Sequence, residues 1–126
     1  MGAGERTERV VLVIVLGCGG RDYDDGYRVM EILDEAHRRY GITEIVTGAA
    51  KGADYLVEEW AKTNRLMYRG MPAQWHIHNK AAGPIRNNRM LELYNPDMVV
   101  AFPGGNGTAH MINAAKKNNK KVVVID

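Results

Sequence analysis

Three of the four residues from Gly104 to Gly107 are glycine, and a hydroxyl side chain, Thr108, follows them. Glycine leaves backbone N–H groups open to an approaching anion. A helix that begins here adds unpaired N–H groups and the positive end of its dipole. Thr108 can either cap this helix or bind a phosphate oxygen. A tight turn without a ligand is the alternative, but the glycine content after Pro103 favours a phosphate-binding loop.

A second loop has similar chemistry. Gly19 and Gly20 expose backbone, and Arg21 supplies a guanidinium suited to bidentate contact with phosphate. The alternative is a solvent-exposed arginine in a turn. The spacing does not match G-x-G-x-x-G, so a standard dinucleotide-binding loop is not predicted.

In a third loop, Gly48 and Gly52 flank Lys51, and Asp54 lies in the first turn of the helix expected next. An acidic residue at this position interacts favourably with the helix dipole. Asp54 can instead accept a hydrogen bond from a ribose hydroxyl or act as a base. The sequence leaves these roles open, with the dipole role slightly favoured.

Arg86 and Arg89 are three residues apart and therefore share a face of the predicted helix. Together they can bind a phosphate, or they can belong to a solvated face. His76 and His78 lack a third ligand nearby in the sequence, so no metal site is predicted. Cys18 lies in the second loop without an evident partner base, which argues against a nucleophile.

Alternating strands and helices must position these loops. Strands are predicted at about 10–16, 43–48, 65–70, 98–102 and 121–126. Helices are predicted at about 29–40, 53–61 and 84–94, a last helix follows the first glycine loop and ends at about 118, and residues 71–83 are predicted to be irregular. This alternation predicts an α/β, Rossmann-like three-layer sandwich with a five-stranded parallel sheet. All three glycine loops follow strands, so we expect them to form one pocket at the carboxyl edge of the sheet.

The 126-residue length predicts a single domain at 10–126 after a disordered tail at 1–9. A net charge of +2 gives little support for nucleic acid as a partner. The single cysteine excludes an internal disulfide and indicates a reducing compartment. The apolar run at 10–16 is too short to span a membrane, and no signal peptide is evident. We therefore expect a cytoplasmic protein that does not contact a membrane.

Four motifs occur in order along residues 10–126: CGGRDY, GAAKGADYLVEEWA, AAGPIRNNRM and AFPGGNGTAHM. Together they resemble the DUF2493 family, the YspA/YpsA-related branch of the SLOG superfamily. The resemblance implies a Rossmann-like fold that binds nucleotides or nucleotide-derived ligands. The superfamily includes the LOG phosphoribohydrolases, the DNA-processing protein DprA and sensor domains for NAD-derived signals. Family members occur in bacteria and phages.

The LOG enzymes carry a PGGxGTxxE motif whose glutamate serves cleavage of an N-glycosidic bond, and Met111 stands at the matching position here. Methionine cannot accept a proton. Its neighbour His110 points about 100° away around the helix. The resemblance therefore predicts a sensor or sponge that binds a phosphorylated, ribose-containing ligand, such as an ADP-ribose or NAD-derived molecule, and requires no cofactor.

Two alternatives remain at this point. One is an N-glycosidase or phosphoribohydrolase in which Asp22 or Asp54 replaces the missing glutamate. The other is a DprA-like binder of single-stranded DNA, which the near-neutral charge and the core-type spacing of the aromatic residues disfavour. A homodimer or larger assembly is expected, partly because related folds pair through helices that flank the site. The predicted ligand-binding residues are Gly19, Gly20, Arg21, Asp22, Gly48, Lys51, Gly52, Asp54, Arg86, Arg89, Pro103, Gly104, Gly105, Gly107 and Thr108.

Overall fold

A computed structural model describes residues 11–126, so the predicted tail at 1–9 lies outside the described residues. The elements along the chain are β1 (Ile14–Cys18), α1 (Gly26–Tyr40), β2 (Glu44–Thr47), α2 (Ala53–Thr63), β3 (Met67–Gly70), α3 (Trp75–His78), the 3₁₀ helix η1 (Asn79–Ala81), α4 (Ala82–Tyr94), β4 (Met98–Ala101), α5 (Asn106–Lys117) and β5 (Lys121–Val124). None of the helices within this range is long and apolar enough to cross a membrane.

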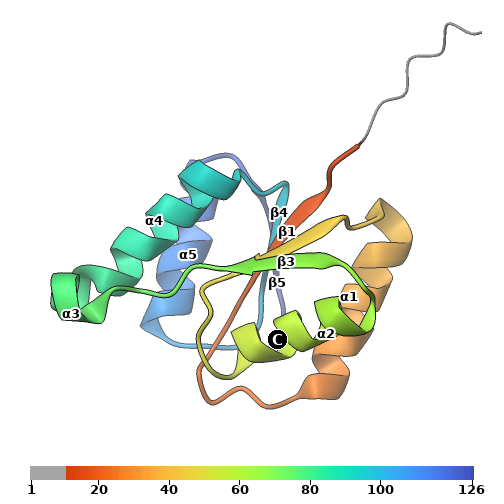
Figure 1. The fold of residues 1–126 in the computed structure, drawn as a ribbon, viewed down its shortest axis with the longest axis horizontal. Coiled ribbons are helices and arrows are strands. Elements are labelled where there is room, and N and C mark those ends of the chain that lie inside the picture. Colours follow the sequence, from red (N-terminus) through yellow and green to blue (C-terminus); the bar gives the residue numbers. More distant parts are fainter. Residues whose placement is uncertain (1–10) are drawn as a thin grey trace, which may run out of the picture.

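The five strands form one parallel sheet in the order β3-β2-β1-β4-β5. Helices α1 and α2 cover one face of the sheet, and α4 and α5 cover the other (Figure 1). The predicted Rossmann-like three-layer architecture is confirmed. It follows from right-handed crossovers, which place a helix over the sheet after each strand.

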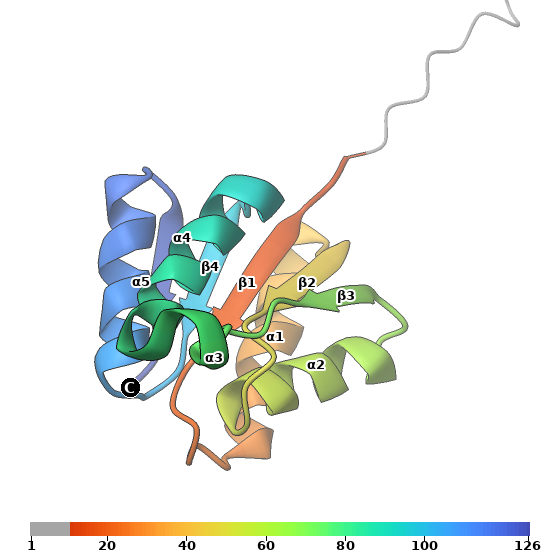
Figure 2. The ribbon, with the colours of Figure 1, turned by 60° about the vertical axis from the view of Figure 1, so that its left-hand side comes forward.

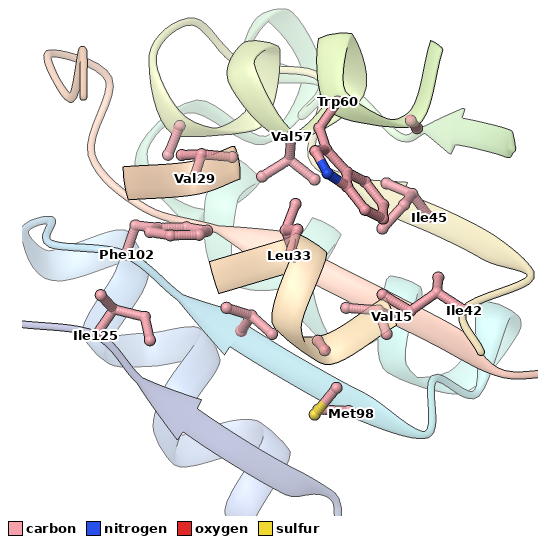
Figure 3. Close-up of a cluster of buried hydrophobic side chains, with 14 residues drawn as sticks. Val15, Val29, Leu33, Ile42, Ile45, Val57, Trp60, Met98, Phe102 and Ile125 are labelled. Atoms are coloured by element: carbon pink, nitrogen blue, oxygen red, sulfur yellow. The ribbon is translucent and has the colours of Figure 1, made fainter. Parts of the chain in front are cut away.

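The central strand β1 supplies side chains to both layers. Val15 packs with Val29 and Leu33 in the cluster that faces α1 and α2, which Figure 3 shows together with Phe102. Its neighbour Leu16 belongs to the cluster on the α4 and α5 side. Successive side chains of a strand point to opposite faces, so an uninterrupted apolar run is what a doubly covered strand requires.

Helix α1 shows how local sequence sets the ends of an element. The carboxylate of Asp25 accepts a hydrogen bond from the Arg28 backbone N–H at 3.0 Å and thereby caps the first turn. Gly41 adopts a left-handed conformation with φ of 66° and donates its N–H to the His37 carbonyl. Gly41 therefore terminates this helix, next to the end at residue 40 that the sequence predicts.

The segment predicted to be irregular contains helical turns instead. Residues 75–81 form α3 and η1, and α4 begins at Ala82, two residues before Pro84. A single turn carries no repeating apolar pattern, which explains why periodicity did not indicate it. Pro84 is accommodated because N–H groups in a first helical turn have no intrahelical partner. The strand predicted to begin at residue 10 begins at Ile14, where pairing with Glu44 of β2 starts.

Candidate functional site

A cavity of about 560 Å³ lies at the carboxyl ends of the central strands. Strand β1 pairs with β2 on one side and β4 on the other, and the chain continues from β1 to α1 on one face of the sheet and from β4 to α5 on the other. All three predicted glycine loops reach the cavity. Of the predicted residues, Gly19, Gly20, Arg21, Gly48, Asp54, Arg86, Gly105, Gly107 and Thr108 line it.

The glycines near the cavity fall into two groups. A Cβ atom on Gly104 would lie 2.2 Å from the Thr108 hydroxyl oxygen and 2.6 Å from the Gly20 nitrogen. The Gly20 N–H also donates a hydrogen bond to the Pro103 carbonyl at 2.8 Å. The loops after β1 and β4 therefore pack backbone against backbone, and Gly104 is required for that packing.

Gly105 and Gly107 belong to the other group. Apart from its chain neighbours and the adjacent backbone of α5, a Cβ atom at either position would meet no atom of the described chain within 4 Å. Both residues line the cavity, at the N-terminus of α5. Internal packing therefore does not explain these two glycines, whereas an open approach to the backbone from the cavity does.

The first turn of α5 offers unpaired donors to the cavity. Gly105 is the N-cap residue, no side chain caps the helix, and the first turn has no acidic residue. The Ala109 N–H bonds to the Gly105 carbonyl at 3.0 Å and begins the regular helical pattern. Of the two roles considered for Thr108, helix capping is absent, and its side chain lies at the cavity wall. Free N–H groups and the helix dipole together favour an anion here.

Asp54 is a buried carboxyl group at the cavity wall. Its residue is 4% exposed, and Oδ2 accepts a hydrogen bond from the Ala50 backbone N–H at 3.1 Å. Burial raises the pKa of Asp54 from 3.8 to about 6, although the Ala50 hydrogen bond and the Arg86 charge act in the opposite direction. This carboxyl group therefore changes charge near neutral pH.

Cys18 also lines the cavity, and burial together with the nearby Asp54 charge raises its pKa to about 12. The reactive form of cysteine is the thiolate, which this environment disfavours. The expectation that Cys18 is not a nucleophile agrees with this pKa.

Arg86 holds two segments of the cavity wall together. Its Nη1 atom donates hydrogen bonds to the carbonyls of Gly48 at 2.6 Å and Met71 at 3.2 Å, and its Nε donates to the Asn87 side chain at 3.0 Å. Partial burial lowers the pKa of its guanidinium. Arg89 does not line this cavity but a neighbouring hollow beside α3. The two guanidiniums of α4 therefore do not face the cavity as the predicted pair.

Several other predicted residues lie outside the cavity wall. Asp22 and Lys51 line an adjoining hollow of about 480 Å³, which shares Arg21 and Trp75 with the cavity. Gly52 has φ of 75°, and a Cβ atom there would lie 2.3 Å from the Gly20 carbonyl oxygen. Like Pro103 and Gly104, Gly52 serves contacts between loops.

Met111 lines the cavity, whereas His110 does not. The His110 Nδ1 atom lies 3.2 Å from the amide nitrogen of Asn87. The cavity wall also includes Trp75, Asn87 and Met90, which the sequence patterns did not indicate. Trp75 could have been found from the sequence, because it is an aromatic residue in a polar segment just before a helix that carries arginines.

Comparison with known proteins agrees with the motifs. The family model described as YspA, cpYpsA-related SLOG family matches residues 13–78. The Gene 61 protein of Mycobacterium phage D29 is 36% identical over 118 residues, covering 86% of this chain and 93% of the phage protein.

Two solved structures share the fold. The molybdenum cofactor binding protein from Rippkaea orientalis aligns with a TM-score of 0.69 and 22% identity, covering 92% of this chain and 77% of its own. MurG from Acinetobacter baumannii aligns with a TM-score of 0.56 and 12% identity, covering 89% of this chain and 34% of its own. The fold, the ordered motifs and the phage relative lead to one assignment: the chain belongs to the YspA, cpYpsA-related SLOG family.

Proposed function

We propose that the protein binds a small nucleotide or nucleotide derivative, with a phosphate group at the N-terminus of α5. The observation that carries this proposal is the pair Gly105 and Gly107, which face open space in the cavity without a packing reason. Their backbone can approach a phosphate closely, and the uncapped first turn supplies N–H donors.

The remaining cavity wall suits such a ligand. Arg21 and Arg86 supply positive charge, and the Asp54 carboxylate can accept hydrogen bonds from ribose hydroxyls. A volume of about 560 Å³ exceeds what a phosphate alone fills and falls in the usual range of small-molecule sites. A protein of the same fold is described as a molybdenum cofactor binding protein, which supports a ligand-binding role for this architecture.

Addition of AMP, ADP-ribose or NAD is expected to raise the melting temperature. A ligand at about 100 times its Kd adds roughly 2.7 kcal/mol to the unfolding free energy, which is about 10 °C for a chain of this size. Differential scanning fluorimetry measures the shift. Arg21→Ala should reduce it, whereas Arg38→Ala, an exposed arginine paired with Glu35 on α1, should leave it unchanged. Absence of a shift with all three compounds contradicts the proposal.

A second candidate function, N-glycoside hydrolysis, is favoured by the burial of Asp54 at the cavity wall, because a carboxyl group with a pKa of about 6 can exchange a proton near neutral pH. Asp22 is no longer an equal candidate, because it lines only the adjoining hollow. We nevertheless propose binding without fast turnover, since Met111 occupies the place of the LOG glutamate. Chromatography of the same incubations detects released base, and release that Asp54→Asn abolishes would establish the hydrolase instead.

We also propose that two copies of the chain associate. Tyr27 at the start of α1 and Leu93 near the end of α4 are 84% and 68% exposed, so each face of the sandwich has a large apolar side chain available to an interface. Light scattering at micromolar concentration is expected to give twice the chain mass of 14.0 kDa. A monomer mass under these conditions would rule out the dimer.

A further inference from the structure

Trp75 is the one aromatic side chain in the cavity wall formed by residues 11–126. It lies on α3 and is 45% exposed. The other tryptophan, Trp60, is buried in the core and donates its indole N–H to Asp34 at 2.8 Å. Trp75 therefore exposes a broad apolar ring at a polar cavity, and this ring is not part of the hydrophobic core.

Contacts from two other elements hold this ring. The Arg21 guanidinium carbon lies 5.2 Å from the centroid of the Trp75 ring, a distance typical of cation–π pairs. Gly83 in the first turn of α4 lies against the Cη2 edge, since a Cβ atom at Gly83 would be 3.5 Å from Cη2. Figure 2 shows α3 at the end of the sheet where β1 and β4 finish. Trp75 is thus positioned over the cavity rather than over open surface.

The cavity wall has distinct polar and apolar contributions. The start of α5 supplies backbone donors, and Asp54 supplies a carboxyl group. Met90 and Met111 are each 1% exposed, so their apolar surface is already buried in the core. Trp75 therefore provides the exposed apolar surface that a ligand in the cavity can contact.

We propose, building on the proposed function, that Trp75 is the surface on which the nucleobase of the ligand stacks. Every base presents a planar π-face, so an aromatic ring contributes to affinity without reading a particular base. The phosphate at α5 and the base at Trp75 would together hold both ends of a nucleoside phosphate. Trp75 thereby makes the site select nucleotides over sugar phosphates.

A comparison of AMP with ribose 5-phosphate, which lacks the base, tests this inference by isothermal titration calorimetry. The unmodified protein should bind AMP at least about fivefold more tightly than ribose 5-phosphate, which is the lower end of stacking effects. Trp75→Ala should remove this difference and leave ribose 5-phosphate binding unchanged, while Trp75→Phe should retain most of it. The exposure of Trp75 means that both variants should fold, which circular dichroism checks.

The outcomes separate the two proposals. If AMP and ribose 5-phosphate bind equally, or if Trp75→Ala leaves AMP affinity unchanged, the stacking inference is wrong and phosphate binding at α5 stands. If neither compound binds, both proposals are wrong.

Fluorescence gives a second readout. In a Trp60→Phe background Trp75 is the single tryptophan of the chain. Saturating AMP should then quench its emission, and saturating ribose 5-phosphate should not. Equal emission with and without AMP overturns the stacking inference.

Discussion

Gly107→Ala is expected to weaken AMP binding more than tenfold while it raises the unfolding free energy by about 0.5–1 kcal/mol. Alanine has the higher helix propensity, and its Cβ atom meets no atom of the described chain within 4 Å. The same methyl group projects where the phosphate must approach the first turn of α5. Loss of one charge-assisted hydrogen bond alone corresponds to about 1.5–3 kcal/mol, which is more than a tenfold change. Urea denaturation and calorimetric titration measure the two effects.

Gly104→Ala provides the matched contrast three residues earlier. Its Cβ atom would overlap the Thr108 hydroxyl and the Gly20 nitrogen, so this variant should lose about 1–3 kcal/mol of stability. Comparison of the Gly104→Ala and Gly107→Ala variants thus distinguishes a glycine required for packing from a glycine required for ligand binding. If Gly107→Ala binds AMP as the unmodified protein does, α5 is not the phosphate site.

Asp54→Asn is expected to stabilise the protein at pH 7.5, by up to about 3 kcal/mol. Folding raises the pKa of this carboxyl from 3.8 to about 6, and each pKa unit corresponds to about 1.36 kcal/mol. At a pH between 3.8 and about 6, the Asp54 carboxyl group is protonated in the folded protein but has released its proton in the unfolded chain. Stability of the unmodified protein therefore falls as pH rises from about 4 to 6. Asparagine retains an oxygen for the Ala50 N–H and has no charge to bury.

Urea denaturation of both proteins at pH 4 and pH 7.5 tests this prediction. The stabilisation by asparagine should be present at pH 7.5 and nearly absent at pH 4. An asparagine variant that is less stable at pH 7.5 would show that the charged carboxylate contributes to folding. If the same variant binds AMP more weakly, ligand binding explains why the cavity wall retains a buried carboxylate that lowers the stability of the fold.

The sequence predicted the fold well because its signals are local and strong. The apolar run that contains Val15 and Leu16 requires cover on both faces, and Gly41 marks a helix end through its backbone conformation. Parallel topology then places every loop that follows a strand at one edge of the sheet. The convergence of the three glycine loops on one cavity follows from those facts alone.

The detailed roles within the site depend on three-dimensional packing. Lys51 and Asp54 are three residues apart, yet the helix start at Ala53 directs Asp54 to the cavity while Lys51 lines the adjoining hollow. Gly104 and Gly105 are indistinguishable in sequence, and only the three-dimensional contacts of Gly104 with the Thr108 hydroxyl and the Gly20 backbone separate them. Trp75 was missed because α3 is one turn long and no periodic pattern indicates where it lies.

The hydrogen bond from Gly20 to Pro103 joins loops that are far apart along the chain, and it forms only where β1 lies beside β4. Contacts of such large sequence separation are costly in chain entropy and tend to form late in folding. A growing chain that has been synthesised only through α4 has β1, β2 and β3 but lacks the second wall of the cavity. The capacity to bind should therefore arise only when β4 has joined the sheet and the first turn of α5 has formed, so ligand binding reports the formation of these two elements.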